Sequence, residues 1–265
     1  MLRKRFGKGH PLVFGHRGAA GLAPENTLPS YALAMALGAD VLEFDVHGTA
    51  DGEIVVIHDP TLERTTSGEG EVRQHTLRQL RQLDAGYQFT RGGADFPFRG
   101  QGVRIPTLAE VIEAFPGVPC NVEIKQEHPG IVEEALSIIR RCGATERLLL
   151  AAEHDSIMAT IRAATSEIPT SFAVGEVVDF MGRVQSGQWE GYQPAGCALQ
   201  IPPAFNDITL VSAETVSIAH RYGIEMHVWT INDREDAAEL LSKGIDGIMS
   251  DLPGMARVAV DALSR

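Results

Sequence analysis

Short apolar segments alternate with amphipathic segments of helical length along the whole chain. The apolar segments are rich in Val, Ile, Leu and Phe, a composition typical of buried strands. Eight main strands are predicted, at Leu12–Gly15, Val41–Val46, Cys120–Ile124, Leu148–Ala152, Thr170–Val174, Ala198–Ile201, Glu225–Thr230 and Gly247–Ser250, with one additional strand-like run at Ile54–Ile57. Helices are predicted between them, at Thr27–Leu37, Leu108–Phe115, Ile131–Cys142, Ile157–Ala164, Val178–Gln188, Ala213–Tyr222, Arg234–Lys243 and Met255–Leu263.

Repeated strand-then-helix units with short connections imply parallel strands, and eight such units are enough to close an α/β barrel of the (β/α)₈ (TIM) type. The length of 265 residues agrees with the roughly 250 that such a barrel needs. No linker-like Gly/Ser or Pro run divides the chain, so a single domain covering residues 1–265 is predicted. An open doubly wound sheet is the alternative fold.

One long irregular stretch interrupts this pattern, from Asp59 to Arg104, after the second main strand and the run that follows it. It is rich in glycine and charged residues and contains a short helical pattern at Leu77–Leu83. Long loops in compact domains are usually functional. We therefore expect this insertion, residues 59–104, to lie over the barrel mouth and to shape specificity.

Composition limits the class of protein. No run approaches the roughly 20 apolar residues of a membrane span, so we expect a soluble protein without stable membrane insertion. Basic residues near the start precede an apolar stretch too short for a signal-peptide core, and we expect a frayed, solvated terminus. The three cysteines, Cys120, Cys142 and Cys197, form no C-x-x-C motif, which indicates a reducing cytoplasm.

Net charge bears on the partners. A formal charge of −12 repels nucleic acid and argues against a phosphate-backbone binder. A site for a small anionic substrate must then be locally positive, and Arg17, Lys125 and a bound cation could supply that charge. The oligomeric state cannot be predicted from the sequence.

Charged and imidazole side chains stand where the predicted strands end, and the carboxyl ends of strands are where barrel enzymes build their active sites. His16 and Arg17 follow the first strand. Next to them, Gly18 would let the backbone approach a ligand closely. An arginine fork suits phosphate oxygens, and an imidazole passes protons near neutral pH.

Two pairs of charged residues are spaced i, i+2 in strands, so each pair lies on one face. Glu43 and Asp45 form the first pair, and Glu123 and Lys125 the second. Buried carboxylates repel one another unless a cation neutralises them. We therefore predict that Glu43, Asp45 and Glu123 bind a hard divalent cation, Mg²⁺ or Ca²⁺, while Lys125 faces phosphate. The alternative is an exposed edge strand with salt-bridged charges.

His58 ends the additional strand-like run, and a second imidazole is what acid–base cleavage needs besides His16. Trp229 stands near the end of the seventh strand and could form an apolar wall for a glycerol-sized group, although an ordinary aromatic of the core or the rim fits equally well. His227 is interpreted as structural, and Asp251, before Leu252 and Pro253, as a helix-start residue.

Taken together, these motifs resemble the glycerophosphodiester phosphodiesterase family, whose signature is H-R, then E-x-D, then H. The matching residues are His16-Arg17, Glu43-Phe44-Asp45 and His58, with Ala23–Thr27, His58–Pro60, Arg64–Thr66, Glu123–Lys125, Val228–Asn232 and Asp246–Asp251 in family-like order. The resemblance extends from residue 14 to residue 251.

The resemblance implies a TIM barrel that hydrolyses glycerophosphodiesters, small-molecule substrates of lipid and glycerol metabolism, to sn-glycerol 3-phosphate and an alcohol. Glu43, Asp45 and Glu123 would bind Mg²⁺ or Ca²⁺, Arg17 and Lys125 the phosphate, and His16 and His58 would form the acid–base pair. By analogy, His16 would act as the base and His58 as the acid, but the sequence also permits the reverse. Either water or the neighbouring glycerol hydroxyl could be the nucleophile.

Three other functions remain open. One is a lysophospholipase D or a phospholipase C-like lyase on the same barrel, for which the sequence shows no amphipathic membrane helix and no exposed aromatic cluster. Another is a histidine-rich metallophosphoesterase, which the absence of an H-x-H motif disfavours. The third is a non-catalytic binding barrel, which the presence of every reactive residue type disfavours.

Overall fold

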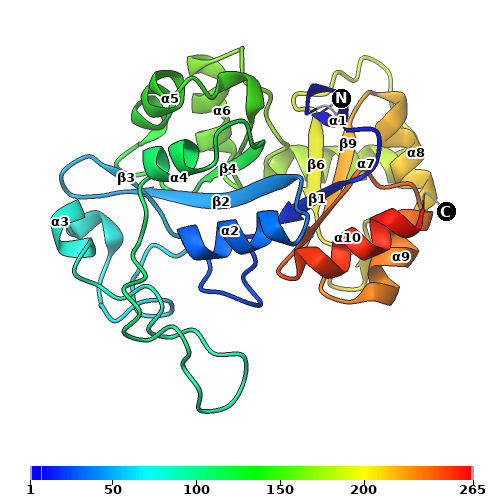
Figure 1. The fold of residues 1–265 in the computed structure, drawn as a ribbon. Helices are drawn as coiled ribbons and strands as arrows, with labels where there is room; N and C mark the ends of the chain where they lie inside the picture. The colour runs from blue at the N-terminus through cyan, green and yellow to red at the C-terminus, as the bar shows by residue number, and fades with distance from the viewer. Residues whose placement is uncertain (1, 7, 264–265) are drawn as a thin grey trace.

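The computed structural model describes residues 2–6 and 8–263 (Figure 1). Its strands are β1 (Leu12–Gly15), β2 (Val41–Gly48), β3 (Ile54–Val56), β4 (Cys120–Ile124), β5 (Leu148–Ala151), β6 (Ala198–Ile201), β7 (Ala204–Phe205), β8 (Ile208–Thr209), β9 (Glu225–Val228) and β10 (Gly247–Ser250). Its α-helices are α1 (Leu2–Arg5), α2 (Leu28–Ala36), α3 (Leu77–Leu80), α4 (Leu108–Ala114), α5 (Val132–Arg141), α6 (Asp155–Ala164), α7 (Val174–Ser186), α8 (Ala213–Arg221), α9 (Arg234–Ser242) and α10 (Pro253–Ala262), with two 3₁₀ helices, η1 (Val72–Gln74) and η2 (Thr145–Arg147).

The main strands form a ring. Seven of them pair in parallel in the order β5-β4-β2-β1-β10-β9-β6. Parallel bridges from Thr170 to Leu150 and from Ser171 to Ala198 join the two ends of this sheet. The short segment at residues 170–171 therefore takes the fifth of eight strand positions, and the predicted (β/α)₈ barrel is confirmed.

The predicted strand Thr170–Val174 is too long, because a helix begins inside it. Val174 is the first residue of α7, four residues earlier than the predicted helical start at Val178. The carboxylate of Glu176 accepts a hydrogen bond from the amide of Ala173 at 2.8 Å, which fixes the first turn. The apolar run of the sequence thus continues from a strand position directly into a helix.

Side chains alternate between the barrel interior and the layer beneath the helices. Val41 packs inside the barrel with Leu12 and Phe14, whereas its strand neighbours Leu42 and Phe44 belong to the core under the helices. The period of two continues along β2. It places the next residues on the interior face, Glu43 and Asp45, at successively higher levels toward the carboxyl end.

The amino end of the barrel is covered by α1. Leu2 and Phe6 are buried against Leu12 and Phe14, and Arg3 Nη2 lies 2.6 Å from the fully buried carboxylate of Asp246. The expectation of a frayed, solvated terminus is therefore wrong for this segment. A four-residue helix lacks the length that a sequence pattern needs, and its stability comes from tertiary packing.

Replacement of Arg3 by alanine is expected to lower the free energy of unfolding by about 3 kcal/mol, because it leaves the charge of Asp246 buried without its guanidinium. Urea denaturation measures this change. Arg78→Ala, at an exposed position of α3, is the control and should stay within about 0.5 kcal/mol of the parent. A loss for Arg3→Ala no larger than the control would contradict this interpretation.

The insertion at residues 59–104 follows β3, which pairs antiparallel with β2. It carries η1 and α3, and its apolar residues share a small core with β3 and its flanking segments, formed by Val55, Ile57, Leu62, Val72, Leu80, Ala85, Val103 and Ile105. Figure 1 shows it extending from the barrel on the side opposite to α1. Two hydrogen bonds tie the insertion to loops at the barrel mouth, as predicted: Arg73 donates to the carbonyl of His128, and Arg91 donates to the carbonyl of Leu22.

Within the described part of the chain, no helix combines the length and the apolar composition that crossing a membrane requires.

Candidate active site

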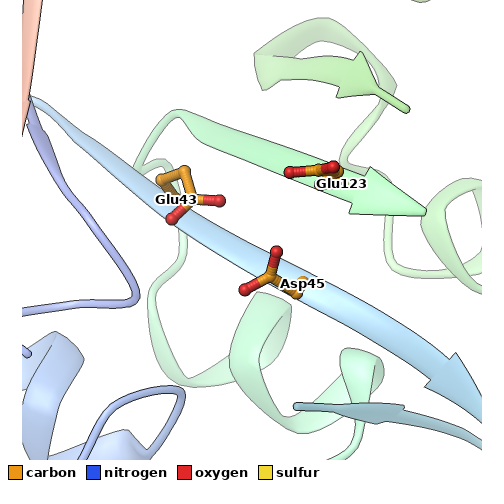
Figure 2. A group of neighbouring side chains, drawn as sticks. All are labelled: Glu43, Asp45 and Glu123. Carbon is orange, nitrogen blue, oxygen red and sulfur yellow. The ribbon is translucent and has the colours of Figure 1, made fainter. Parts of the chain in front are cut away.

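Three acidic side chains meet on the interior face of β2 and β4 (Figure 2). The strands pair with Glu43 opposite Asn121 and Asp45 opposite Glu123. One carboxylate oxygen from each of Glu43, Asp45 and Glu123 lies within 4.8 Å of the others. The structure therefore brings together the three residues that the sequence predicted as metal ligands.

The electrostatics of this acidic cluster favour a cation. Burial, followed by the negative charge of Asp45, raises the pKa of Glu43 to about 7. Burial also raises the pKa of Glu123, whereas Lys125 and Arg17 overcome burial at Asp45 and lower its pKa. Burial and the neighbouring carboxylate of Asp45 thus make a negative charge on Glu43 unfavourable. The three carboxylates are oxygen donors of the kind that hard divalent cations prefer, and such a cation would offset this cost.

Two cations of the protein flank the acidic cluster. Lys125 Nζ lies 2.8 Å from Glu123 Oε1 and 3.5 Å from Asp45 Oδ1. The backbone amide of Arg17 donates to Glu43 Oε2 at 2.8 Å. Arg17 Nε is buried 3.5 Å from Asp45 Oδ2 and forms an ion pair with this carboxylate.

An unusual backbone turn aims Arg17 at this place. Arg17 has φ = 49° and Gly18 has φ = 91°, both in the left-handed region. Gly18 tolerates that conformation, and a Cβ there would clash with Ser30. Strain of this kind is held by the surrounding structure and is concentrated at functional sites.

Each of the two predicted catalytic histidines is paired with an aspartate through Nδ1. His16 Nδ1 lies 2.7 Å from Asp251 Oδ1, and His58 Nδ1 lies 2.6 Å from Asp59 Oδ1. A carboxylate at Nδ1 holds the ring so that Nε2 faces the site as a proton acceptor or donor. Burial lowers the pKa of His16, but the hydrogen bond to Asp251 and the charge of Glu43 outweigh it, so the pKa is raised.

Asp251 was interpreted as a helix-start residue, and this is wrong. The N-cap of α10 is Leu252, and the carboxylate of Asp251 bonds His16 on one side and Asn232 Nδ2, at 2.6 Å, on the other. Because β10 pairs with β1, the residue after β10 lies beside the residue after β1. That strand pairing, rather than any local motif, was the signal that could have revealed this contact.

Trp229 follows β9 on the interior side, two residues beyond His227, and is 40% exposed. It therefore lies at the rim rather than in the core. His227 is fully buried and bonds Glu225 at 3.2 Å, in keeping with its structural interpretation. Of the eight residues predicted for the site, Arg17, Lys125 and the three acids are joined to one another by hydrogen bonds and ion pairs, whereas His16, His58 and Trp229 have no such contact with the other predicted residues.

Beside Lys125 lies an open cavity of about 210 Å³. It is lined by His47, Pro60, Glu71, Arg73, Lys125, Gln126, Glu127 and His128. The insertion contributes Glu71 and Arg73, and the loop after β4 contributes Glu127 and His128. Of these lining residues, Lys125 alone also contacts the acidic cluster, through Asp45 and Glu123.

The chain matches the model of the glycerophosphoryl diester phosphodiesterase family over residues 16–255. The chain belongs to this family. It is therefore an enzyme, a phosphoric diester hydrolase, as the order of its motifs predicted.

Individual relatives agree over most of their length. A glycerophosphodiester phosphodiesterase of Caldanaerobacter subterraneus subsp. tengcongensis is 34% identical over 249 residues, covering 91% of this chain and 94% of the relative. The solved structure of an Oleispira antarctica phosphodiesterase in complex with the product sn-glycerol-3-phosphate is 30% identical, with a TM-score of 0.78 over 95% of this chain and 97% of that one. The glycerophosphoryl diester phosphodiesterase domain of a Mycobacterium tuberculosis protein has a TM-score of 0.83 at 21% identity, over 94% and 98%, and supports the fold.

An arginine of the insertion connects the two sides of this phosphodiesterase site, and the sequence analysis assigned it no role. Arg64 donates to both oxygens of Glu25, each at 2.7 Å, and to both oxygens of Asp59, at 2.5 and 3.0 Å. Glu25 also accepts from Arg17 at 3.0 Å, and Asp59 pairs with His58. Arg64 thus holds in place the two carboxylates that contact Arg17 and His58, which the sequence predicted as a phosphate-binding residue and a catalytic residue.

Arg64→Ala is expected to lower kcat/KM about 10–100-fold, because Glu25 and Asp59 lose the guanidinium hydrogen bonds that hold their carboxylates in place. Steady-state hydrolysis of glycerophosphocholine measures the effect. Arg64→Lys, which keeps the charge without the fork, should recover only part of the activity. Arg78→Ala, an exposed arginine of the same insertion, should leave kcat/KM unchanged. If Arg64→Ala folds and matches that control, Arg64 has no positioning role.

Proposed function

We propose that this enzyme hydrolyses glycerophosphodiesters to sn-glycerol 3-phosphate and an alcohol, with His16 and His58 as the acid–base pair. The observation that carries the proposal is the acidic cluster of Glu43, Asp45 and Glu123, contacted by the cationic Arg17 and Lys125 and accompanied by the His16–Asp251 and His58–Asp59 pairs. The name of the Caldanaerobacter relative and the product in the Oleispira structure support this choice of substrate. Incubation with glycerophosphocholine, followed by ³¹P NMR, tests it: a glycerol 3-phosphate signal is expected, and an unchanged diester would contradict it.

Glu43, Asp45 and Glu123 would hold Mg²⁺ or Ca²⁺, which when bound would withdraw charge from the non-bridging phosphate oxygens. The residues of the chain perform the remaining steps. Arg17 and Lys125 bind the phosphate and offset its charge. His16 Nε2 removes a proton from the nucleophile, whether water or the neighbouring glycerol hydroxyl. His58 Nε2 donates a proton to the departing alcohol oxygen. Trp229 provides an apolar wall for the glycerol, and the cavity beside Lys125 has room for the leaving alcohol.

The pH profile tests the role of His16. Asp251 raises the pKa of His16, so Asp251→Asn should lower it and keep the imidazole neutral to a lower pH. With His16 as base, the acid limb of the kcat profile moves to lower pH, and kcat falls because the ring is less well oriented. A shift of the alkaline limb instead would assign His16 as the acid. A profile unchanged in both limbs would show that Asp251 does not act on His16.

A further inference from the structure

A third histidine lies at the mouth of the barrel, in a place that the sequence pattern did not link to the site. His47 stands on β2 two residues beyond Asp45, so the period of two places it on the interior face, after Glu43 and Asp45. It is buried, with 4% of its surface exposed, and it lines the cavity beside Lys125. A buried imidazole needs hydrogen-bond partners, and the partner of this one belongs to a predicted catalytic residue.

His47 Nε2 lies 3.0 Å from the backbone carbonyl oxygen of His58. A carbonyl oxygen only accepts hydrogen bonds, so Nε2 carries a hydrogen and donates it, whether the ring is neutral or charged. The pairing of β2 with β3 ends just before this point, where the amide of Ile57 donates to the carbonyl of Asp45 at 3.0 Å. The side chain of His47 thus extends the attachment of this segment to β2 by one residue.

That carbonyl belongs to the peptide bond between His58 and Asp59, whose side chains bond each other at 2.6 Å. Neighbouring side chains of an extended strand point to opposite faces and cannot make such a contact. The backbone therefore bends here, and the orientation of this peptide decides whether the carboxylate of Asp59 reaches Nδ1 of His58. Arg64 holds the carboxylate of Asp59 from the solvent side, whereas His47 holds the peptide from the interior.

A second set of contacts fixes the end of β2 that carries His47. The amide of Gly48 donates to Gln126 Oε1 at 3.2 Å, and Gln126 Nε2 donates to the carbonyl of Pro129 at 2.8 Å. The buried side chain of Gln126 thereby ties this end of β2 to the loop after β4. Because β2 also carries two residues of the acidic cluster, one strand sets the position of the cluster and, through His47, that of His58.

We propose that His47 is a positioning residue for the acid–base reaction: its hydrogen bond to the peptide between His58 and Asp59 holds the His58 ring in the orientation that proton transfer requires. This inference rests on the function proposed above and adds a residue to the same site. His47 itself transfers no proton, because the hydrogen on its Nε2 is used in the bond to His58. Loss of this bond should act on turnover rather than on binding, since Arg17 and Lys125 remain in place.

The experiment replaces His47 by leucine, which removes the donor, and by glutamine, whose side-chain amide can still donate to the carbonyl. In His47→Leu, kcat for glycerophosphocholine should fall about 10–100-fold, while KM and the affinity for sn-glycerol 3-phosphate stay within about threefold. His47→Gln should recover most of the lost kcat. His220→Leu is the matched control, because His220 bonds the carboxylate of Asp246 at 2.7 Å at the amino end of the barrel. This control should lower stability and keep the parental kcat.

A second readout does not depend on activity. The proton on Nδ1 of His58, in its short bond to Asp59, should give a deshielded ¹H NMR resonance, identified by its loss in His58→Ala. This resonance should shift or broaden in His47→Leu and return in His47→Gln.

The outcomes separate this inference from the proposed function. Parental kcat in folded His47→Leu, an unchanged resonance, or a loss in His47→Gln as large as in His47→Leu would overturn the positioning role. Should the leucine variant unfold, His47→Met, which also lacks a donor, replaces it. A parent enzyme that cleaves no glycerophosphocholine overturns the proposed function, and the resonance then still decides whether His47 holds His58.

Discussion

Alanine in place of His16 or His58 is expected to lower kcat by about 10²–10⁴-fold, the contribution of a positioned acid or base in a transition state. An enzyme that keeps only one of the two rings has one proton transfer unassisted, so turnover should be severely impaired in both single variants. The double variant should be little worse than the poorer single one, because residues that act as a unit are not additive.

Substrate binding should survive in these variants, because Arg17, Lys125 and the acidic cluster remain. The measurement is single-turnover release of glycerol 3-phosphate, with product affinity determined by calorimetry. His154→Ala, at an exposed histidine before α6, is the matched control and should retain the parent rate. Near-parental turnover of either His16→Ala or His58→Ala would contradict the acid–base assignment.

Glu43→Gln is expected to have opposite effects on stability and activity. The pKa of Glu43 is raised to about 7 from 4.5, so its folded form resists ionisation. A carboxyl with a raised folded pKa costs stability as the pH rises from about 4.5 through 7, and the full cost remains at pH 8. Without divalent cations, Glu43→Gln should therefore stabilise the protein at pH 8 by about 1–3 kcal/mol.

With divalent cations the order should reverse. The parent should gain thermal stability on addition of Mg²⁺ or Ca²⁺, because a ligand that binds only the folded state stabilises it. Glu43→Gln should lose most of this gain, and its kcat/KM should fall at least about 100-fold. Thermal unfolding with and without cation measures both effects, and Glu190→Gln, at an exposed position, is the control. A cation-induced gain equal in Glu43→Gln and the parent would show that Glu43 is not a ligand.

Sequence alone predicted the residues that depend on strand periodicity. Glu43, Asp45 and Glu123 were assigned to one face because side chains alternate along a strand, and parallel pairing of β2 with β4 then places them together. His16 and Arg17 were assigned to the mouth because they directly follow the first strand, and Lys125 because it is spaced i, i+2 from Glu123. These conclusions needed only local pattern and the rule for the carboxyl ends of barrel strands.

Contacts between distant segments were not predictable in this way. Asp251 reaches His16 across 235 positions, and its local sequence, followed by Leu252 and Pro253, is that of a helix start. Arg64 is one of many charged residues in the insertion until the fold brings it between Glu25 and Asp59. The four residues of α1 and the paired dipeptides of β7 and β8 are too short to give a periodic signal.

The central claim is that Glu43, Asp45 and Glu123 hold a divalent cation next to a phosphate that both imidazoles reach. A crystal grown with Mn²⁺ and sn-glycerol 3-phosphate, measured by anomalous diffraction, tests it most directly. We predict one strong anomalous peak among these three carboxylates, with His16 and His58 both within hydrogen-bonding reach of the same phosphate. A peak bound elsewhere, or a phosphate that only one of the two rings can reach, would contradict the account.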